Sequence, residues 1–222
     1  MLKITLKFAL QITKIIFLLS KRHKFFLLFN LIFTPIFNRI FDYEYVYERT
    51  KLYEDFIKKD FIYFIELPKN KKVLDVGCGA GVLTTLTSGV GIDRIKYPQW
   101  ASNFFIIGDA EYLPFKKSSF DLVILSNLLE HVDDYKKVIS EAKRVSKDMI
   151  YVSFPTKYSF SALYHYLSKT KKYSAFYGGL DYDMVKSSFS SFRVLKENER
   201  FLPFKLKNNF SNPEILFKKK NI

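Results

Sequence analysis

The chain has 222 residues, of which 48% are hydrophobic, and its formal net charge is +14. This hydrophobic content supports a folded core and excludes a generally disordered chain. The single cysteine, Cys78, excludes an internal disulfide and a cysteine-rich zinc site, and no metal-binding cluster is visible in the sequence. The basic excess indicates an anionic neighbour, either a membrane surface or nucleic acid, with an unspecialised basic surface as the alternative.

Residues 1–41 carry half of the excess positive charge and contain no acidic residue. Lys3, Lys7, Lys14 and Lys21 are spaced to share one face of a helix, and Ile and Phe side chains cover much of the rest. The uncharged run 25–38 is too short to span a bilayer. We expect an amphipathic helical segment that lies on an anionic membrane, which would make this a cytoplasmic protein held peripherally on the inner membrane face. A helical pair packed on the rest of the protein is the alternative.

Residues 42–222 are expected to form one α/β domain, beginning with one or two helices within 42–66. From Val73 onward, short apolar segments alternate with helical patterns, which is typical of parallel βαβ units. The pattern predicts a doubly wound, Rossmann-like, mostly parallel sheet of about seven strands. The expected strands are 73–76, 90–92, 104–107, 122–125, 149–152, 192–195 and 215–218, and the expected helices include 82–87, 133–146 and 183–188.

The most informative motif is VLDVGCGAG at residues 73–81, where an apolar strand runs into a glycine-rich turn. Gly77, Gly79 and Gly81 permit tight dihedrals and close approach of a ligand to the backbone. The dinucleotide-binding fingerprint G-x-G-x-x-G requires its last glycine at position 82, which here is Val82. This spacing disfavours NAD and flavin. Cys78 is interpreted as a small loop residue rather than a nucleophile.

Three later blocks place polar residues where the predicted strands end. Asp93, in VGID, can accept hydrogen bonds from both hydroxyl groups of a ribose and would repel a 2′-phosphate. Asp109, in IIGDAEYLPF, can accept a hydrogen bond from an adenine amino group, and Ala110 leaves room for the ring. Ser126 and Asn127, in FDLVILSNLLEHV, fall at the carboxyl edge of the sheet, where ligands of open sheets bind. The alternatives are a helix cap for Asp93 and a surface loop for Asp109.

These four blocks, in this order, resemble the class I methyltransferases that use S-adenosylmethionine (SAM), and especially their small-molecule and lipid branch, which includes the ubiquinone and menaquinone methyltransferases. The resemblance implies SAM as cofactor. It places Asp75, Gly77, Cys78, Gly79 and Gly81 around the methionine end of SAM, although Asp75 also fits a turn or cap. It assigns the ribose to Asp93 and the adenine to Asp109 and Ala110. Only eleven residues separate Gly81 from Asp93, so the first helix is expected to be short.

The resemblance also implies an enzyme that aligns an acceptor for in-line attack on the methyl group of SAM. SNLL at 126–129 replaces the NPPY-like motif of amino-methylating nucleic-acid enzymes, and no second cysteine is present for covalent pyrimidine methylation. We therefore expect a small-molecule, lipid or glycolipid acceptor. An RNA-directed methyltransferase and a catalytically silent, membrane-associated SAM-binding protein are the alternatives.

Two further features are candidates for the acceptor side of the site. His131 could act as a general base, with a structural or packing histidine as the alternative. Residues 151–182 are rich in Phe and Tyr and are expected to form a lid over an apolar acceptor, with a packing insert as the alternative. The sequence indicates no oligomeric state.

Overall fold

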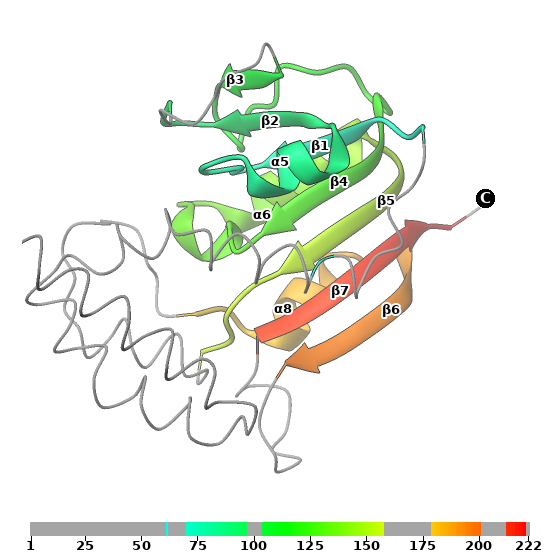
Figure 1. Ribbon diagram of the computed structural model, residues 1–222. Helices are drawn as coiled ribbons and strands as arrows, with labels where there is room; N and C mark the ends of the chain where they lie inside the picture. The colour runs from blue at the N-terminus through cyan, green and yellow to red at the C-terminus, as the bar shows by residue number, and fades with distance from the viewer. Residues whose placement is uncertain (1–60, 62–69, 97–103, 158–178, 201–211, 221–222) are drawn as a thin grey trace, which may run out of the picture. The chain divides into compact units, whose positions relative to one another are not determined.

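The computed structural model describes residues 61, 70–96, 104–157, 179–200 and 212–220 (Figure 1). The chain divides into two units, Met1–Val46 and Tyr47–Ile222, and every described residue belongs to the second. The predicted amphipathic segment 1–41 lies outside the described residues, as do the predicted helices within 42–66 apart from Phe61. In the described part of the chain, no helix has the length and apolar character needed to cross a membrane.

One sheet of seven strands organises the second unit, in the order β3-β2-β1-β4-β5-β7-β6. Only β7 runs against its neighbours, so the prediction of a doubly wound, mostly parallel sheet is confirmed. The central strands are short and almost wholly apolar because both of their faces are covered. The strands are β1 (Val73–Val76), β2 (Val90–Asp93), β3 (Phe105–Ile107), β4 (Phe120–Ser126), β5 (Ser146–Ser153), β6 (Phe192–Arg200) and β7 (Asn212–Lys219).

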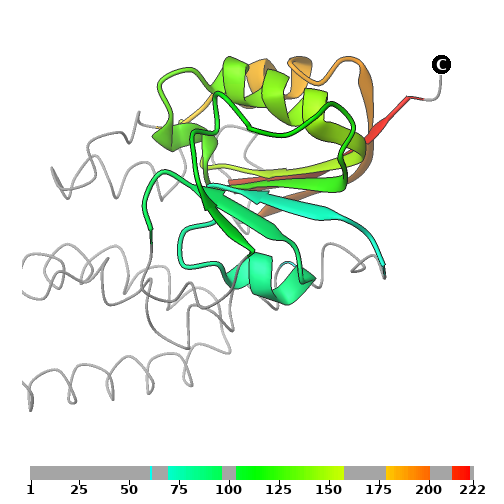
Figure 2. The ribbon, with the colours of Figure 1, turned by 90° about the horizontal axis from the view of Figure 1, so that it is seen from above.

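Helices cover the two faces of this sheet unequally. Helices α6 (Tyr135–Val145) and α8 (Tyr182–Ser187) lie on one face, and α5 (Val82–Thr87) lies on the other, as Figure 2 shows. Helix α6 is strongly amphipathic and buries four apolar residues against the sheet: Val138, Ile139, Ala142 and Val145. With only six residues, α5 is as short as the sequence predicts.

Several predicted boundaries need correction. The helix expected over 133–146 begins at Tyr135, because Asp134 caps it by accepting a hydrogen bond from the Lys137 amide. It ends before Ser146, which already pairs with Phe120 as the first residue of β5. The last helix is displaced by one residue from the expected 183–188. Strands β6 and β7 are longer than expected because two neighbouring strands can pair through their backbones whatever their side chains.

The segment predicted as a lid, 151–182, also has different limits. Residues 151–153 belong to β5, where Tyr151 is buried, and Tyr182 is the first residue of α8. The stretch left between these elements is 154–181, and 158–178 lie outside the described residues.

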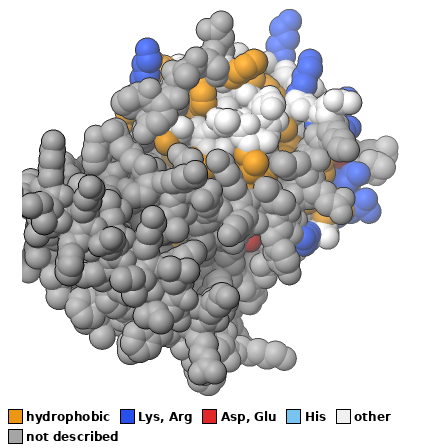
Figure 3. Space-filling view, in the orientation of Figure 1, with side chains coloured by type: hydrophobic (Ala, Val, Ile, Leu, Met, Phe, Trp, Pro, Cys, Tyr) orange, Lys and Arg blue, Asp and Glu red, His pale blue; other side chains and the backbone are white. Residues whose placement is uncertain are grey.

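Basic side chains gather at the edge of the sheet where the parallel strands begin. Lys72 precedes β1, Lys147 lies at the start of β5, and the antiparallel β7 brings Lys218 to the same edge. Two acids partly balance them: Asp121 lies 3.7 Å from the Lys147 Nζ, and Asp148 lies 3.8 Å from the Lys218 Nζ. Figure 3 shows several of the lysine and arginine side chains at the right of the view, where β7 ends.

Candidate cofactor site

The strand order reverses at β1, whose two neighbours are β2 and β4, and in open α/β sheets ligands bind outside the carboxyl ends of the strands at such a switch point. The turns that follow β1 and β4 meet there. A Cβ atom added to Gly77 would lie only 2.5 Å from Cδ1 of Leu128. With a φ of 68° and this close contact, Gly77 suits the approach of the two turns better than any residue with a side chain, which would be strained there and would displace Leu128.

The glycine turn is attached to the end of β2. The amides of Gly77 and Cys78 both donate to the Ile92 carbonyl, at 2.8 and 3.2 Å. The Gly79 amide donates to Oδ2 of Asp93 at 2.8 Å. Gly79 has a φ of 50°, and a Cβ added there would meet no atom within 4 Å. The position that a side chain at Gly79 would occupy is thus open space, which a ligand could fill.

Asp93 ends β2 beside this turn, as predicted from VGID. Besides the Gly79 bond, its Oδ1 accepts from the Ile95 amide at 3.0 Å. Each carboxylate oxygen can accept a second hydrogen bond, so both remain able to receive a ribose hydroxyl. The open space at Gly79 and this acceptor capacity fit the cofactor that the sequence motifs imply.

Asp75 is buried, and its contact is with α5 rather than with the open space. Its Oδ2 accepts a 2.7 Å hydrogen bond from the Thr84 hydroxyl. Burial raises the pKa of the Asp75 carboxyl to about 6, although the Thr84 bonds oppose this rise. This geometry favours a role in positioning α5. The contact with the methionine end of SAM that the resemblance implies stays a prediction, and the bonds to Thr84, in the first turn of α5, are compatible with the cap alternative.

Cys78 lies within the turn and is partly buried. Burial, and then the negative charges of Asp75 and Asp93, raise the pKa of its thiol above the usual range. Both effects disfavour the reactive thiolate, in keeping with a packing role.

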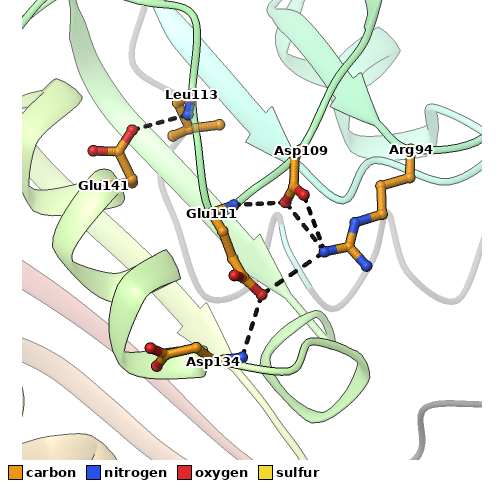
Figure 4. Close-up of polar contacts among 6 residues, drawn as sticks. All are labelled: Arg94, Asp109, Glu111, Leu113, Asp134 and Glu141. Carbon is orange, nitrogen blue, oxygen red and sulfur yellow. Dashed lines mark hydrogen bonds and ion pairs between the residues drawn. The ribbon is translucent and has the colours of Figure 1, made fainter.

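Asp109 and Ala110 follow β3, where an ion-pair cluster fixes the loop (Figure 4). The Arg94 Nη2 lies 3.2 Å from both carboxylate oxygens of Asp109 and 3.7 Å from Oε1 of Glu111. Glu111 in turn accepts a 3.2 Å hydrogen bond from the Asp134 amide, which ties the loop to the start of α6. Ala110 is buried in the main core, so its small size also has a packing reason.

Helix α6 anchors the later part of this loop, around Leu113 and Phe115. Glu141 accepts a 2.8 Å hydrogen bond from the Leu113 amide, as Figure 4 shows. Arg144 pairs with Glu141 at 2.7 Å and donates to the carbonyl groups of Leu113 and Phe115. Asp109 is thus presented by a loop that is anchored on both sides.

At the end of β4, the two predicted residues are bonded to β5. The hydroxyl groups of Ser126 and Ser153 lie 3.2 Å apart, and the Asn127 amide donates to the Ser153 carbonyl at 2.9 Å. Asn127 adopts a left-handed φ of 48°, which turns the chain sharply at the carboxyl edge. The short helical turn η1 (Leu129–His131) follows directly.

The turn η1 carries His131, the predicted base, and an acid that the sequence motifs do not single out. His131 is 42% exposed, and its Nε2 lies 3.8 Å from Oε1 of Glu130. Glu130 is 2% exposed, and its Oε2 has no hydrogen-bond partner. Burial raises the pKa of Glu130 to about 8. The signal in the sequence is a lone acid in the apolar run LLEHV that follows a strand.

In the described part of the chain, no group of three or more His, Cys, Asp or Glu residues could hold a metal ion. The arrangement instead joins a glycine turn, two carboxylates at the ends of β2 and β3, and a buried acid after β4. These groups suit an adenosyl ligand with an amino-acid end.

Comparisons with known proteins agree with this assignment. Residues 74–149 match the family described as "Methyltransferase domain". The demethylmenaquinone methyltransferase of Geobacillus stearothermophilus is 28% identical over 170 residues, which are 66% of this chain and 70% of that protein. The ubiquinone biosynthesis O-methyltransferase of Thiobacillus denitrificans is 31% identical over 102 residues, and these span only 44% of its length.

The fold also occurs among solved structures. A SAM-dependent methyltransferase from Thermotoga maritima, described as a possible histamine N-methyltransferase, aligns with a TM-score of 0.59 at 17% identity, over 86% of this chain and all of that one. A SAM-dependent methyltransferase from Archaeoglobus fulgidus aligns with the same score at 18% identity, over 75% of this chain and 94% of that one. Its motifs, its strand order and these matches together support a class I SAM-dependent methyltransferase, an enzyme whose methyl donor is S-adenosylmethionine.

Proposed function

We propose that this methyltransferase acts on a small-molecule, lipid or glycolipid acceptor, and that a hydroxylated ring with a lipid tail is the first candidate. The observation that carries the proposal is the similarity to demethylmenaquinone methyltransferase, which extends over 170 residues and so well beyond the cofactor motifs. The similarity to a ubiquinone biosynthesis O-methyltransferase points to the same kind of acceptor.

Different residues of this chain would bind different parts of the cofactor and the acceptor. S-adenosylmethionine, when bound, supplies an electrophilic methyl group on a sulfonium. The glycine turn and Asp93 would hold the methionine and ribose parts, and Asp109 the adenine, while His131, in η1 after β4, would serve the acceptor. Because the sulfonium is already activated, alignment of the acceptor and exclusion of water are the main contributions of the protein.

The test is a labelling experiment on fractionated cell extract. The purified full-length protein is incubated with SAM that carries a labelled methyl group, together with lipid, water-soluble and RNA fractions. We expect label in the lipid or small-molecule fraction, and mass spectrometry then identifies the product. Label confined to RNA would support the RNA-directed alternative. Absence of label from every fraction, with SAM binding intact, would support a catalytically silent SAM-binding protein.

We also propose that residues 1–41 hold the enzyme peripherally on the inner face of an anionic membrane. The support is the stripe formed by Lys3, Lys7, Lys14 and Lys21 among apolar residues. Each basic residue at such a surface contributes about 1 kcal/mol, an effect that salt weakens. In full-length protein, the quadruple Lys→Gln variant of this stripe should sediment less with anionic vesicles. A matched control replaces Lys71, Lys147, Lys218 and Lys220, and equal losses in the two variants would remove the special role of residues 1–41.

A further inference from the structure

Glu130 occupies an unusual position for a carboxyl group. It lies in the η1 turn after β4, and the same turn region contributes Leu128, which packs against Gly77 of the glycine turn. Glu130 is therefore on the cofactor side of the sheet, at the switch point. Its side chain is almost completely buried, and Oε2 has no hydrogen-bond partner.

A buried carboxylate without a counter-charge is strongly disfavoured. In Glu130, burial raises the pKa to about 8, opposed only by a backbone hydrogen bond. The ionisable groups nearest in the chain are His131 in the same turn, Asp133 and Asp134 after it, and Tyr135 at the start of α6. None of them contributes to the shift of the Glu130 pKa, and Asp75 across the sheet does not either. Glu130 is thus mostly neutral at pH 7.

The neutral form of Glu130 is favoured only while the site holds no positive charge, because a nearby cation would stabilise the carboxylate. SAM carries a sulfonium cation, whereas its product, S-adenosylhomocysteine, carries an uncharged thioether. We propose that Glu130 is the counter-charge of the sulfonium: its carboxyl group is neutral in the unliganded enzyme, ionised in the SAM complex, and neutral again once the methyl group has left.

The transfer step is then balanced in charge. An acceptor atom that bears a proton forms a bond to the methyl carbon, and the carbon–sulfur bond breaks with its electron pair left on sulfur. The proton lost by the acceptor passes to the Glu130 carboxylate. One cation and one anion become a thioether and a carboxylic acid, so the buried site holds no net charge before or after the step.

This inference rests on SAM as the cofactor and not on the class of acceptor. It can therefore be tested by binding alone, and its failure would leave the proposed acceptor untouched. The experiment measures the affinities of full-length protein for SAM and for S-adenosylhomocysteine by calorimetry, between about pH 6 and pH 9.5.

In the wild type, the preference for SAM over S-adenosylhomocysteine should rise as the pH approaches about 8 and level off above it, because ionised Glu130 favours the sulfonium. The rise should be about tenfold if the sulfonium lowers the pKa of Glu130 by about one unit. The E130Q variant keeps the neutral shape, so its preference should lack this rise. Comparing E130Q with the wild type cancels the titration of the ligand's own amino group.

Two controls separate this role from a structural one. The E130Q variant should bind S-adenosylhomocysteine like the wild type, which shows that the crevice is intact, and H131Q should keep the pH-dependent preference. If E130Q does not fold, the wild type alone can test the proposal. With a shift of about one unit from a pKa of about 8, SAM binding near pH 7.5 should release about half a proton more than S-adenosylhomocysteine binding does, as measured in buffers of different ionisation enthalpy. Equal proton release for both ligands, or the same pH dependence in E130Q and the wild type, would overturn the proposal.

Discussion

The Gly79 amide donates a 2.8 Å hydrogen bond to Oδ2 of Asp93, so the turn after β1 and the acid that ends β2 form one unit. Loss of the Asp93 carboxylate should therefore act twice. It would remove the acceptor that we expect to bind the ribose, and it would release the turn that holds Gly79.

The D93A variant should weaken SAM binding by about 1–3 kcal/mol, because the ribose hydroxyl groups lose a charged acceptor. Calorimetric titration measures this loss. The matched control is D148A, which removes an acid at the opposite edge of the sheet and should leave SAM binding unchanged. Unaltered affinity in a folded D93A variant would remove Asp93 from the site.

Gly77 and Gly79 should respond differently to alanine. Both have positive φ, so each substitution should cost about 1–2 kcal/mol of stability from the backbone alone. G77A should cost more, because its Cβ would overlap the Leu128 side chain, and a second substitution, L128A, should recover part of that excess. G79A should instead reduce SAM affinity, since its Cβ enters open space. Denaturant unfolding and calorimetry measure the two effects, and equal stability losses with equal SAM affinities would contradict this distinction.

Asp75 should make stability depend on pH. Its folded-state pKa of about 6 is above the ordinary value of 3.8, so the native state holds the proton more tightly than the unfolded chain. The stabilisation from protonated Asp75 is complete below about pH 3.8 and is lost as the pH rises through about 6. Relative to the wild type, D75N should gain up to about 3 kcal/mol between these limits. Urea unfolding at several pH values measures the gain, and a constant difference would show that Asp75 does not titrate in this range.

Arg94 and Asp109 should have opposite effects on the cofactor. The exposed ion pair should contribute no more than about 1 kcal/mol to stability. If Asp109 receives the adenine amino group, D109A should weaken SAM binding by about 1 kcal/mol. R94A removes a competing donor and a positive charge, so it should bind SAM at least as tightly as the wild type, most clearly at low salt. A loss in R94A equal to that in D109A would mean that Arg94 orients Asp109 for the ligand.

The sequence motifs predict the central sheet well because its strands are apolar runs bounded by glycine or by charged residues. Asp93 lies at the strand end that VGID indicates. Contacts between residues of separate segments are harder to predict from the sequence. The Arg94–Asp109 pair, for example, depends on how two loops approach one another. The sequence also does not predict the burial of Glu130, because an acid just after a strand is equally compatible with an exposed turn.

The two edges of the sheet differ in charge. Lysines outnumber the acids Asp121 and Asp148 where the strands begin, and Asp93, Asp109 and Glu111 outnumber their partner Arg94 where the strands end. A cationic ligand approaching a chain of net charge +14 would meet repulsion if that charge were spread evenly. The carboxylates at the crevice instead create a local field that attracts a cation over roughly a Debye length. If this local field governs the encounter with SAM, added salt should slow association, whereas a uniformly basic protein would show the reverse.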